Sequence, residues 1–530
     1  MNRLSICYLL VAFGVGCLIR LVPSVISFPY PIGYDAVNYY LPNLYHFESD
    51  WVKLITEFPI YIATVYLFSF SFSADIYYSF LASNVVLYGV FSVSIYLLSN
   101  KILKQTLNVS LISTIFVIFQ LGTLRISWDL FRDLFSLILF NVFLVLVDYL
   151  NKKNAWNHFV SVFAVFFVSV FAVFSDRMIG VLLIFVSFIF SFTFRQKYLF
   201  MINAFFAFSF LFYFLSFDKI TFISNNVDLI ETLSSPLYAK NTFSKFDISV
   251  LFLSLYVVLI PFFIVGFVNK KPKGTILIIK IPLMVTLFLS FTWIFIPNYS
   301  HLAPERWLLI FGIYMSLIAM RGFLLLIDTF LGLRDTFARK GVIFTFLLAF
   351  VIYGFLFAVM PYGVTFSIPS VFQENTKFIF PLSMLFNSID IKDNHEMIEF
   401  IEWINSNTLD NSTIIGTKHW RGWFSLFLDP PRKYIFAENF VNYEVISANE
   451  KGNLNHSNAL EKNLTMYLCN NLDTNTNSNS TLRSANTSLY FVDYGNNNIY
   501  RNKNNSLLSV MDYKSKKFVI YSLTNYACNN

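Results

Sequence analysis

The sequence predicts a polytopic α-helical membrane protein with about eleven transmembrane helices and a small C-terminal α/β domain outside the membrane. Of the 530 residues, 56% are hydrophobic and only 13% are charged, and the mean hydropathy is +0.60. These values lie well away from those of a soluble globular domain. Apolar runs long enough to cross the hydrocarbon core recur from Leu4 to Met360, and after Met360 they shorten while Asn, Ser and Thr become abundant.

The predicted spans follow the apolar runs in order along the chain. They lie near residues 4–27, 76–99, 108–124, 133–150, 157–175, 178–194, 199–217, 249–268, 276–296, 307–327 and 342–360. The run 58–72 is short, contains Pro59 near its start and is interleaved with tyrosines. We interpret it as a helix at the membrane surface, and a re-entrant or crossing segment is the alternative.

Lysines and arginines predict the orientation, because short loops rich in these residues stay in the cytoplasm. With 58–72 outside the membrane core, the basic clusters fall in every second loop, and the N-terminus is then cytoplasmic. The clusters are Lys101 and Lys104, Lys152 and Lys153, Arg195 and Lys197, Lys270, Lys271 and Lys273, and Arg334, Arg339 and Lys340. We expect a multi-pass protein of an archaeal or bacterial cell membrane or of the ER membrane, whose first span is an uncleaved signal anchor.

The domain organisation follows from the change at Met360. We expect a transmembrane domain over 1–360, with a first outer loop at 28–75, and an extracytoplasmic domain over 361–530. Segment 395–404 has helical periodicity, and four segments have the pattern of short strands. These strands are 413–417, 433–438, 488–495 and 517–523. The Asn-rich and Ser-rich interval 447–487 is interpreted as a flexible insertion.

Acceptor sequons also favour an outward C-terminal region, which would make the protein a glycoprotein. They stand at Asn298, Asn411, Asn455, Asn463, Asn479, Asn486 and Asn504. Asn-rich sequence generates sequons by chance, so this pattern is consistent with an outward face without proving it. Cys469 and Cys528 are the cysteines that could pair there, and their spacing leaves the pairing open.

Most of the candidate chemistry collects in the predicted outward loops. Asp35 lies in PIGYDAVNYYLP, the first polar loop, and its alternative role is to cap the short helix that follows. The other loops carry arginines together with acids: Arg125, Asp129, Arg132 and Asp133 in RISWDLFRDL, Asp176 and Arg177 in FSDRMIG, and Glu305 and Arg306 in NYSHLAPERW. Charges close to the membrane are costly and usually mark a substrate path or site.

The spacing in RISWDLFRDL predicts that its four charged residues share one face of an extended helix end. Intrahelical ion pairs at the water boundary are the alternative. Arginine side chains bind phosphate oxygens in bidentate fashion, so several of them just above the bilayer suit a lipid-linked phosphate.

Three further side chains are acceptor-side candidates: His301, His419 and Arg421. The tryptophans of HWRGW (419–423) could stack on a glycan or belong to a domain core. No cysteine and histidine grouping has zinc spacing and no nucleotide-binding motif is present, so we predict no metal site, no cofactor and no nucleic-acid partner. A divalent cation stays open as an alternative.

The first span, the GYD loop rich in tyrosine, the helix within that loop and the outer C-terminal domain together resemble the GT-C class of membrane glycosyltransferases. That class includes the protein O-mannosyltransferases, aminoarabinose transferases and oligosaccharyltransferases. The resemblance implies a sugar donor linked to polyprenyl phosphate, used on the outer face, and a glycan, lipid or protein acceptor.

The resemblance also implies residue roles. Asp35 would be the general base in an inverting transfer, and Arg125, Arg132, Arg177 and Arg306 would bind the donor phosphate. Asp129, Asp133, Asp176 or Glu305 would be supporting acids, because Ala36 stands where many mannosyltransferases of the class have a second acid. The oligosaccharyltransferase motif WWDxG is absent, which argues against glycan transfer to asparagine.

Two other classes remain as alternatives. A transporter or flippase of a lipid-linked or anionic substrate would also carry buried charges on many helices, but the sequence has no convincing internal repeat. A membrane scaffold that displays its outer domain is disfavoured by the clustered outer arginines.

Overall fold

The computed structural model describes residues 3–45, 59–152, 158–194, 197–223, 245–269, 276–295, 303–329, 336–359, 389, 393–416, 420–436, 489–494, 508–510 and 518–523. The chain forms two compact units. The first unit comprises Met1–Ile32, His46–Pro361 and Pro369–Leu385, and the second comprises Gly33–Tyr45, Tyr362–Ile368 and Phe386–Asn530. Each unit is described by itself below.

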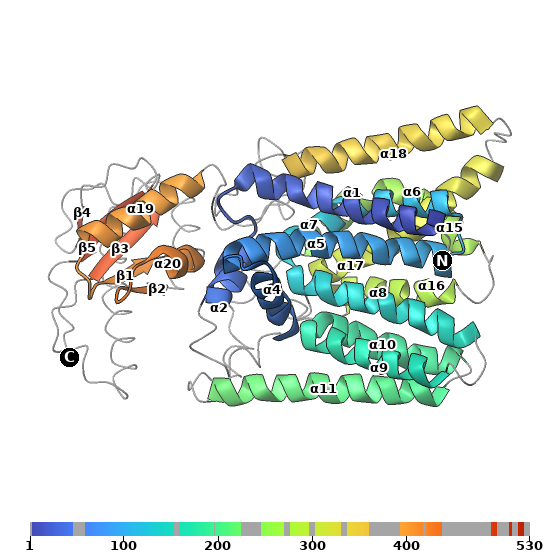
Figure 1. The fold of residues 1–530 in the computed structure, drawn as a ribbon, viewed down its shortest axis with the longest axis horizontal. Coiled ribbons are helices and arrows are strands. Elements are labelled where there is room, and N and C mark those ends of the chain that lie inside the picture. The colour runs from blue at the N-terminus through green and yellow to red at the C-terminus, as the bar shows by residue number, and fades with distance from the viewer. Residues whose placement is uncertain are drawn as a thin grey trace. The chain divides into compact units, whose positions relative to one another are not determined.

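The first unit is built entirely from helices in its described part (Figure 1). In chain order these are α1 (Arg3–Ser27), α4 (Pro59–Phe72), α5 (Ile76–Leu97), η3 (Leu98–Ile102), α6 (Leu107–Ile118), α7 (Leu121–Asp129), α8 (Phe131–Lys152), α9 (His158–Ser175), α10 (Arg177–Thr193), α11 (Lys197–Ile223), α14 (Lys245–Tyr256), η5 (Val257–Leu259), α15 (Ile260–Val268), α16 (Leu277–Ser290), η6 (Thr292–Ile294), α17 (Pro304–Thr329) and α18 (Thr336–Val359).

Described helices coincide with the predicted apolar spans, and the prediction of a polytopic helical membrane protein is confirmed. Among the residues that the structure describes, seven helices are long and apolar enough to cross a membrane, and there are eight if the bent pair α6 and α7 counts as one span. The apolar stretches assigned to α9, α10 and α11 are shorter, and they comprise Val160–Ser175, Arg177–Thr193 and Lys197–Phe212. The count of eleven therefore stays a prediction.

The predicted span 108–124 corresponds to two helices, α6 and α7, which are bent by 64° relative to each other. The chain leaves helical geometry at Gln120, whose side chain accepts a hydrogen bond from the Thr123 amide at 3.2 Å. This bond caps a new helix in place of the continuing ladder. A polar side chain among apolar neighbours thus redirects the backbone.

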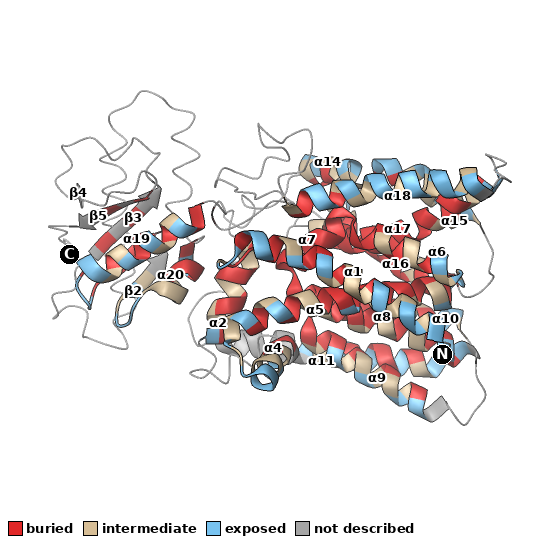
Figure 2. Cartoon of the chain, turned by 45° about the horizontal axis from the view of Figure 1, so that its top comes forward, coloured by how far each residue is buried: buried red, intermediate tan, exposed pale blue. Residues whose placement is uncertain are grey.

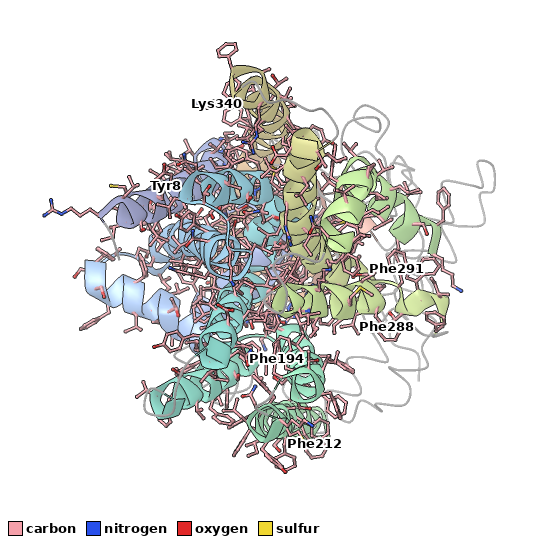
Figure 3. All side chains as sticks on the ribbon, turned by 90° about the vertical axis from the view of Figure 1, so that its right-hand side faces the viewer. Tyr8, Phe194, Phe212, Phe288, Phe291 and Lys340 are labelled. Carbon is pink, nitrogen blue, oxygen red and sulfur yellow. The ribbon has the colours of Figure 1, made fainter. Side chains whose placement is uncertain are left out.

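The core of the first unit lies around α17. In its most apolar stretch 83% of the residues are buried, against 17% in α18, and Figure 2 shows this contrast as a red α17 and a largely pale α18. The periphery is lined with phenylalanines such as Phe212, which is 63% exposed and lies at the edge of the bundle in Figure 3. Such a surface suits contact with lipid tails.

Segment 58–72, predicted to lie at the membrane surface, contains helix α4. Tyr61 and Val65 on this helix are fully buried, whereas Phe70 is 87% exposed. The helix packs against α5 and α9. Its position relative to the bilayer stays a prediction.

The second unit contains a five-stranded mixed sheet with the order β2-β1-β3-β5-β4. The strands are β1 (Thr413–Gly416), β2 (Lys433–Phe436), β3 (Leu489–Tyr494), β4 (Leu508–Val510) and β5 (Phe518–Leu523), and the helices are α19 (Asn394–Asn407) and α20 (Arg421–Phe427). β1 pairs in parallel with β2 and β3, and β5 is antiparallel to β3 and β4. The predicted helix and all four predicted strands form, while α20 and β4 were not predicted.

Part of the predicted first outer loop belongs to this second unit. Residues 33–45 form the π-helical turn η1 (Ala36–Tyr40) and the short helix α2 (Leu41–Tyr45), and both pack against α20. Gly33 has φ 104°, a conformation that L residues with a side chain rarely adopt, so a glycine is needed where the chain turns into η1.

Close packing of α15 on α17 generates the first prediction. A Cβ at Gly322 would overlap the Phe262 carbonyl oxygen and lie 2.6 Å from the Gly266 nitrogen, so the two backbones would have to separate. We expect Gly322→Ala to lower the free energy of unfolding by about 1–3 kcal/mol.

The measurement is thermal unfolding of the purified protein in detergent. Gly341→Ala is the matched control, because a Cβ at Gly341 meets nothing within 4 Å and alanine favours the helix. Equal melting temperatures for the two variants would contradict this account of the α15 and α17 interface.

Candidate functional site

The junction between α7 and α8 is a buried part of the first unit that contains several polar residues. The α7 ladder closes with the Leu130 amide on the Ile126 carbonyl at 3.0 Å, and Leu130 then leaves helical geometry with φ −103° and ψ 56°. The end of a helix leaves its last carbonyls without intrahelical donors. The junction therefore needs a hydrogen-bond donor from another element.

Arg20 of α1 supplies this donor. Its Nε donates to the Ser127 carbonyl oxygen at 2.7 Å, and its Nη1 donates to Ser24 Oγ at 2.7 Å. The guanidinium also lies 5.8 Å from the centroid of the Phe131 ring, and Arg20 is only 1% exposed. A cation at the C-terminal end of α7 also complements the helix dipole.

Phe131, the first residue of α8, is held by aromatic rings from two other helices. Tyr61 of α4 stacks on it at 6.3 Å with an interplanar angle of 6°, and Phe80 of α5 meets it edge-on at 5.2 Å. The Tyr61 hydroxyl donates to Asn84 Oδ1 at 2.8 Å. Elements α1, α4 and α5 thus fix the start of α8.

Asp133, in the first turn of α8, lies within a cluster of charges that we call the acid–arginine cluster, defined as Arg132, Asp133, Asp176 and Arg306. The Asp133 and Asp176 carboxyl groups lie close enough to interact, and the charges of Arg306 and Arg132 act on Asp133. Asp133 and Asp176 are 2% and 3% exposed. Two carboxyl groups this close need positive charge around them, and the two arginines provide it.

Helix termini position this cluster. Asp176 precedes α10, and its Oδ1 accepts a hydrogen bond from the Ile179 amide at 3.0 Å, which caps the helix. Arg177 is the first residue of α10, and Glu305 and Arg306 lie in the first turn of α17. Loops that are distant in the sequence thus contribute charges to one buried place.

The prediction that Arg125, Asp129, Arg132 and Asp133 share one helix face is wrong, because the helix ends at Asp129 and a new one begins at Phe131. Arg125 and Asp129 form an ion pair within α7 at 2.7 Å. The alternative of an intrahelical ion pair thus holds for these two residues. They are 7% and 4% exposed, however, so they do not mark a water boundary.

Asp35 belongs to the second unit, whereas the candidate arginines other than Arg421 belong to the first. Asp35 precedes η1 in helical geometry, and its side chain makes no capping hydrogen bond there. The alternative of a helix-capping acid is therefore wrong. The catalytic role of Asp35 stays a prediction.

The tryptophans of HWRGW belong to the core of the second unit. Trp420 and Trp423 are 0% and 1% exposed, and Trp420 meets Phe518 of β5 edge-on at 5.6 Å. Arg421 is exposed at the start of α20, while His301 and His419 lie outside the described residues. Of the two alternatives for the tryptophans, the structure shows the domain core.

Within the described ranges, no three His, Cys, Asp or Glu side chains are grouped so that they could hold a metal ion.

Sequence reasoning missed Arg20, Tyr61 and Asn84 as parts of this polar region. Arg20 did carry a signal, because an arginine inside an apolar span is costly unless it has partners. Tyr61 was attributed to a surface helix, and an asparagine in an apolar run has no periodicity that would reveal its partner.

Comparisons with known proteins place the fold. The chain matches the crystal structure of ArnT from Cupriavidus metallidurans bound to undecaprenyl phosphate, with a TM-score of 0.53 and 9% sequence identity over 99% of each chain. It matches the apo state of the same ArnT with a TM-score of 0.54 and 10% identity, over 97% of this chain and 98% of that one. Neither a family model nor a curated protein matches the sequence.

The chain therefore has an ArnT-like fold, as the resemblance to the GT-C class predicted. The likeness extends over 99% of each chain. At this level of identity it concerns the fold, and the chemistry has to be argued from the residues.

The cap on α10 gives the second prediction. Asp176→Ala removes the acceptor for the Ile179 amide, and we expect it to lower the free energy of unfolding by about 1 kcal/mol. Asp176→Asn retains a side-chain oxygen and removes one of two close acids, so its stability should match or exceed that of the wild type.

Thermal unfolding in detergent distinguishes these effects. If Asp176→Asn were as unstable as Asp176→Ala, the charge of Asp176 and not its capping bond would stabilise the start of α10.

Proposed function

We propose that this protein is a membrane glycosyltransferase that transfers a sugar from a polyprenyl-phosphate-linked donor to an acceptor on the extracytoplasmic face. The observation that carries the proposal is the ArnT-like fold over 99% of the chain. The ArnT structure with this fold is bound to undecaprenyl phosphate, a lipid with an anionic headgroup. A donor of the same chemical class would suit a chain with several arginines at the ends of its membrane helices.

The charges of the first unit support an anionic ligand. The named arginines outnumber the named acids by one: Arg20, Arg125, Arg132, Arg177 and Arg306 against Asp129, Asp133, Asp176 and Glu305. All the described side-chain partners of Arg20 are neutral. Arginine charges at the ends of membrane helices are costly, and the phosphate of a lipid donor would provide a further counter-ion for them.

In the proposed reaction, a carboxylate removes the proton from an acceptor hydroxyl as its oxygen attacks the anomeric carbon. The bond from this carbon to the phosphate oxygen breaks, and the polyprenyl phosphate leaves with the bonding electrons. The configuration of the sugar inverts. Asp35 is the proposed base, and arginines of the acid–arginine cluster are proposed to stabilise the leaving phosphate.

Only the chemical class of the acceptor is proposed. The acceptor is a glycan, a lipid or a protein, and mannose is one candidate sugar. Transport of a lipid-linked substrate remains the second functional class, because buried arginines also suit that task. Turnover distinguishes the two classes, since a transporter leaves the sugar on its carrier.

The third prediction tests the reaction and its base. Membranes that contain the wild-type protein should transfer label from one member of a panel of radiolabelled polyprenyl-phosphate sugars. Asp35→Asn, at matched abundance, should reduce transfer by at least about 100-fold, because an amide cannot accept the proton.

Three outcomes separate the possibilities. Loss of transfer in Asp35→Asn supports both the class and the base. Transfer that survives the substitution removes Asp35 from this role. Movement of an intact lipid-linked sugar across the membrane, without transfer, would replace the transferase proposal with the flippase.

The fourth prediction concerns the donor phosphate. Arg306→Met should raise KM for the lipid-linked donor by about 10–100-fold, since a charge-assisted hydrogen bond to phosphate is lost. Arg306→Lys should recover part of this loss by retaining the charge.

Arg339→Met is the matched control, because Arg339 forms an exposed ion pair with Asp328 at 2.8 Å, on α18 and outside the acid–arginine cluster. An unchanged KM in Arg306→Met, or an equal change in Arg339→Met, would exclude Arg306 from donor binding.

A further inference from the structure

The segment that carries Asp35 is folded against the C-terminal domain. Residues 33–45 belong to the second unit, where η1 and α2 pack against α20. Asn38 is hydrogen-bonded to Gly422, which lies 384 residues later in the sequence. The geometry of the Asp35 segment is therefore set by a long-range contact within this unit.

Asn38 makes a hydrogen bond on each side of this contact. Its Oδ1 accepts from the Gly422 amide of α20 at 3.0 Å, and its Nδ2 donates to the Tyr34 carbonyl at 3.3 Å. The Tyr34 carbonyl belongs to the peptide group that leads into Asp35. One amide side chain thus connects α20 to the backbone of the candidate base.

Gly422 allows the close approach that this bond requires. A Cβ at Gly422 would overlap the Val37 carbonyl group and lie 2.7 Å from the Asn38 Cα. These atoms belong to the backbone of η1, so no side-chain rotation could relieve the overlap. Any larger residue at 422 must move η1 away from α20.

The core of the second unit in turn holds α20. Trp420 and Trp423 flank the contact and are buried, and Phe424 stacks on Tyr434 of β2 at 4.4 Å. At the far end of α20, Asn405 of α19 makes a comparable pair of bonds. It donates to the Phe427 carbonyl at 2.9 Å and accepts from the Asp429 amide at 3.0 Å. The helix is therefore a fixed support for η1.

We propose that Asn38 and Gly422 are positioning residues through which the C-terminal domain sets the place of Asp35 for the transfer reaction. The inference rests on the proposed function of Asp35 as base. It adds that the C-terminal domain takes part in building the catalytic loop. A base that is displaced by about 1 Å can lose a factor of about 100 in rate.

The test compares Asn38→Leu, Gly422→Ala and the control Asn405→Leu in the full-length protein. Asn405→Leu is the same substitution and also removes one bond to a carbonyl and one from a backbone amide. These bonds lie at the end of α20 away from η1. Any general weakening of the domain should therefore affect Asn38→Leu and Asn405→Leu alike.

The first readout is hydrogen–deuterium exchange of peptides that cover residues 33–45, which needs no activity. We expect exchange to become about tenfold faster in Asn38→Leu, because two hydrogen bonds are lost, and faster also in Gly422→Ala. Asn405→Leu should leave it unchanged.

The second readout is transfer kinetics. Asn38→Leu and Gly422→Ala should lower kcat by about 10–100-fold with little change in KM for the donor, and Asn405→Leu should keep the wild-type kcat. A wild-type kcat in Asn38→Leu, or equal losses in Asn405→Leu, would overturn the proposal.

The two readouts also separate this inference from the proposed function. If the wild type transfers no sugar, the proposed function fails, and the exchange of 33–45 still decides whether α20 holds the segment. Unchanged exchange in both Asn38→Leu and Gly422→Ala would overturn the positioning role whatever the protein transfers.

Discussion

The hydrogen bond from Arg20 to the Ser127 carbonyl is the interaction on which the polar centre of the first unit depends. It supplies a hydrogen-bond donor to a carbonyl that has no intrahelical partner at the end of α7. Inside a membrane protein, such a group has to be satisfied by another part of the protein. The α7–α8 junction directly follows this carbonyl. Arg125 and Arg132 lie on either side of this junction. The orientation of their side chains therefore depends on the Arg20 guanidinium of α1.

Burying that guanidinium has a cost, which explains the residues around it. The Phe131 ring and two oxygen acceptors contribute partial negative charge without cancelling the positive charge. A carboxylate in their place would neutralise the charge of Arg20. The neutral partners thus leave the positive charge of Arg20 in place, and under the proposed function that charge would favour an anionic lipid phosphate.

The sequence predicted what depends on local periodicity and failed where a single polar group decides. Hydropathy located the membrane helices, and alternation located four strands of the sheet. RISWDLFRDL reads as one helix because its charges have helical spacing, and only the bond from Arg20 and the backbone at Leu130 reveal the break. The contact of Asn38 with Gly422 was equally invisible, since neither residue has an unusual local pattern.

The contact at Gly422 also gives a reason why a glycine stands between two buried tryptophans. Trp420 and Trp423 need a helix to direct both rings into the core, and a side chain at 422 would hold that helix away from η1. In the sequence RGW, the buried Trp423 therefore anchors α20 in the core, and Gly422 lets the backbone of η1 approach closely. A site on a loop becomes as well defined as the element that supports it. In this chain that element is α20, so the geometry of the Asp35 segment depends on the C-terminal domain.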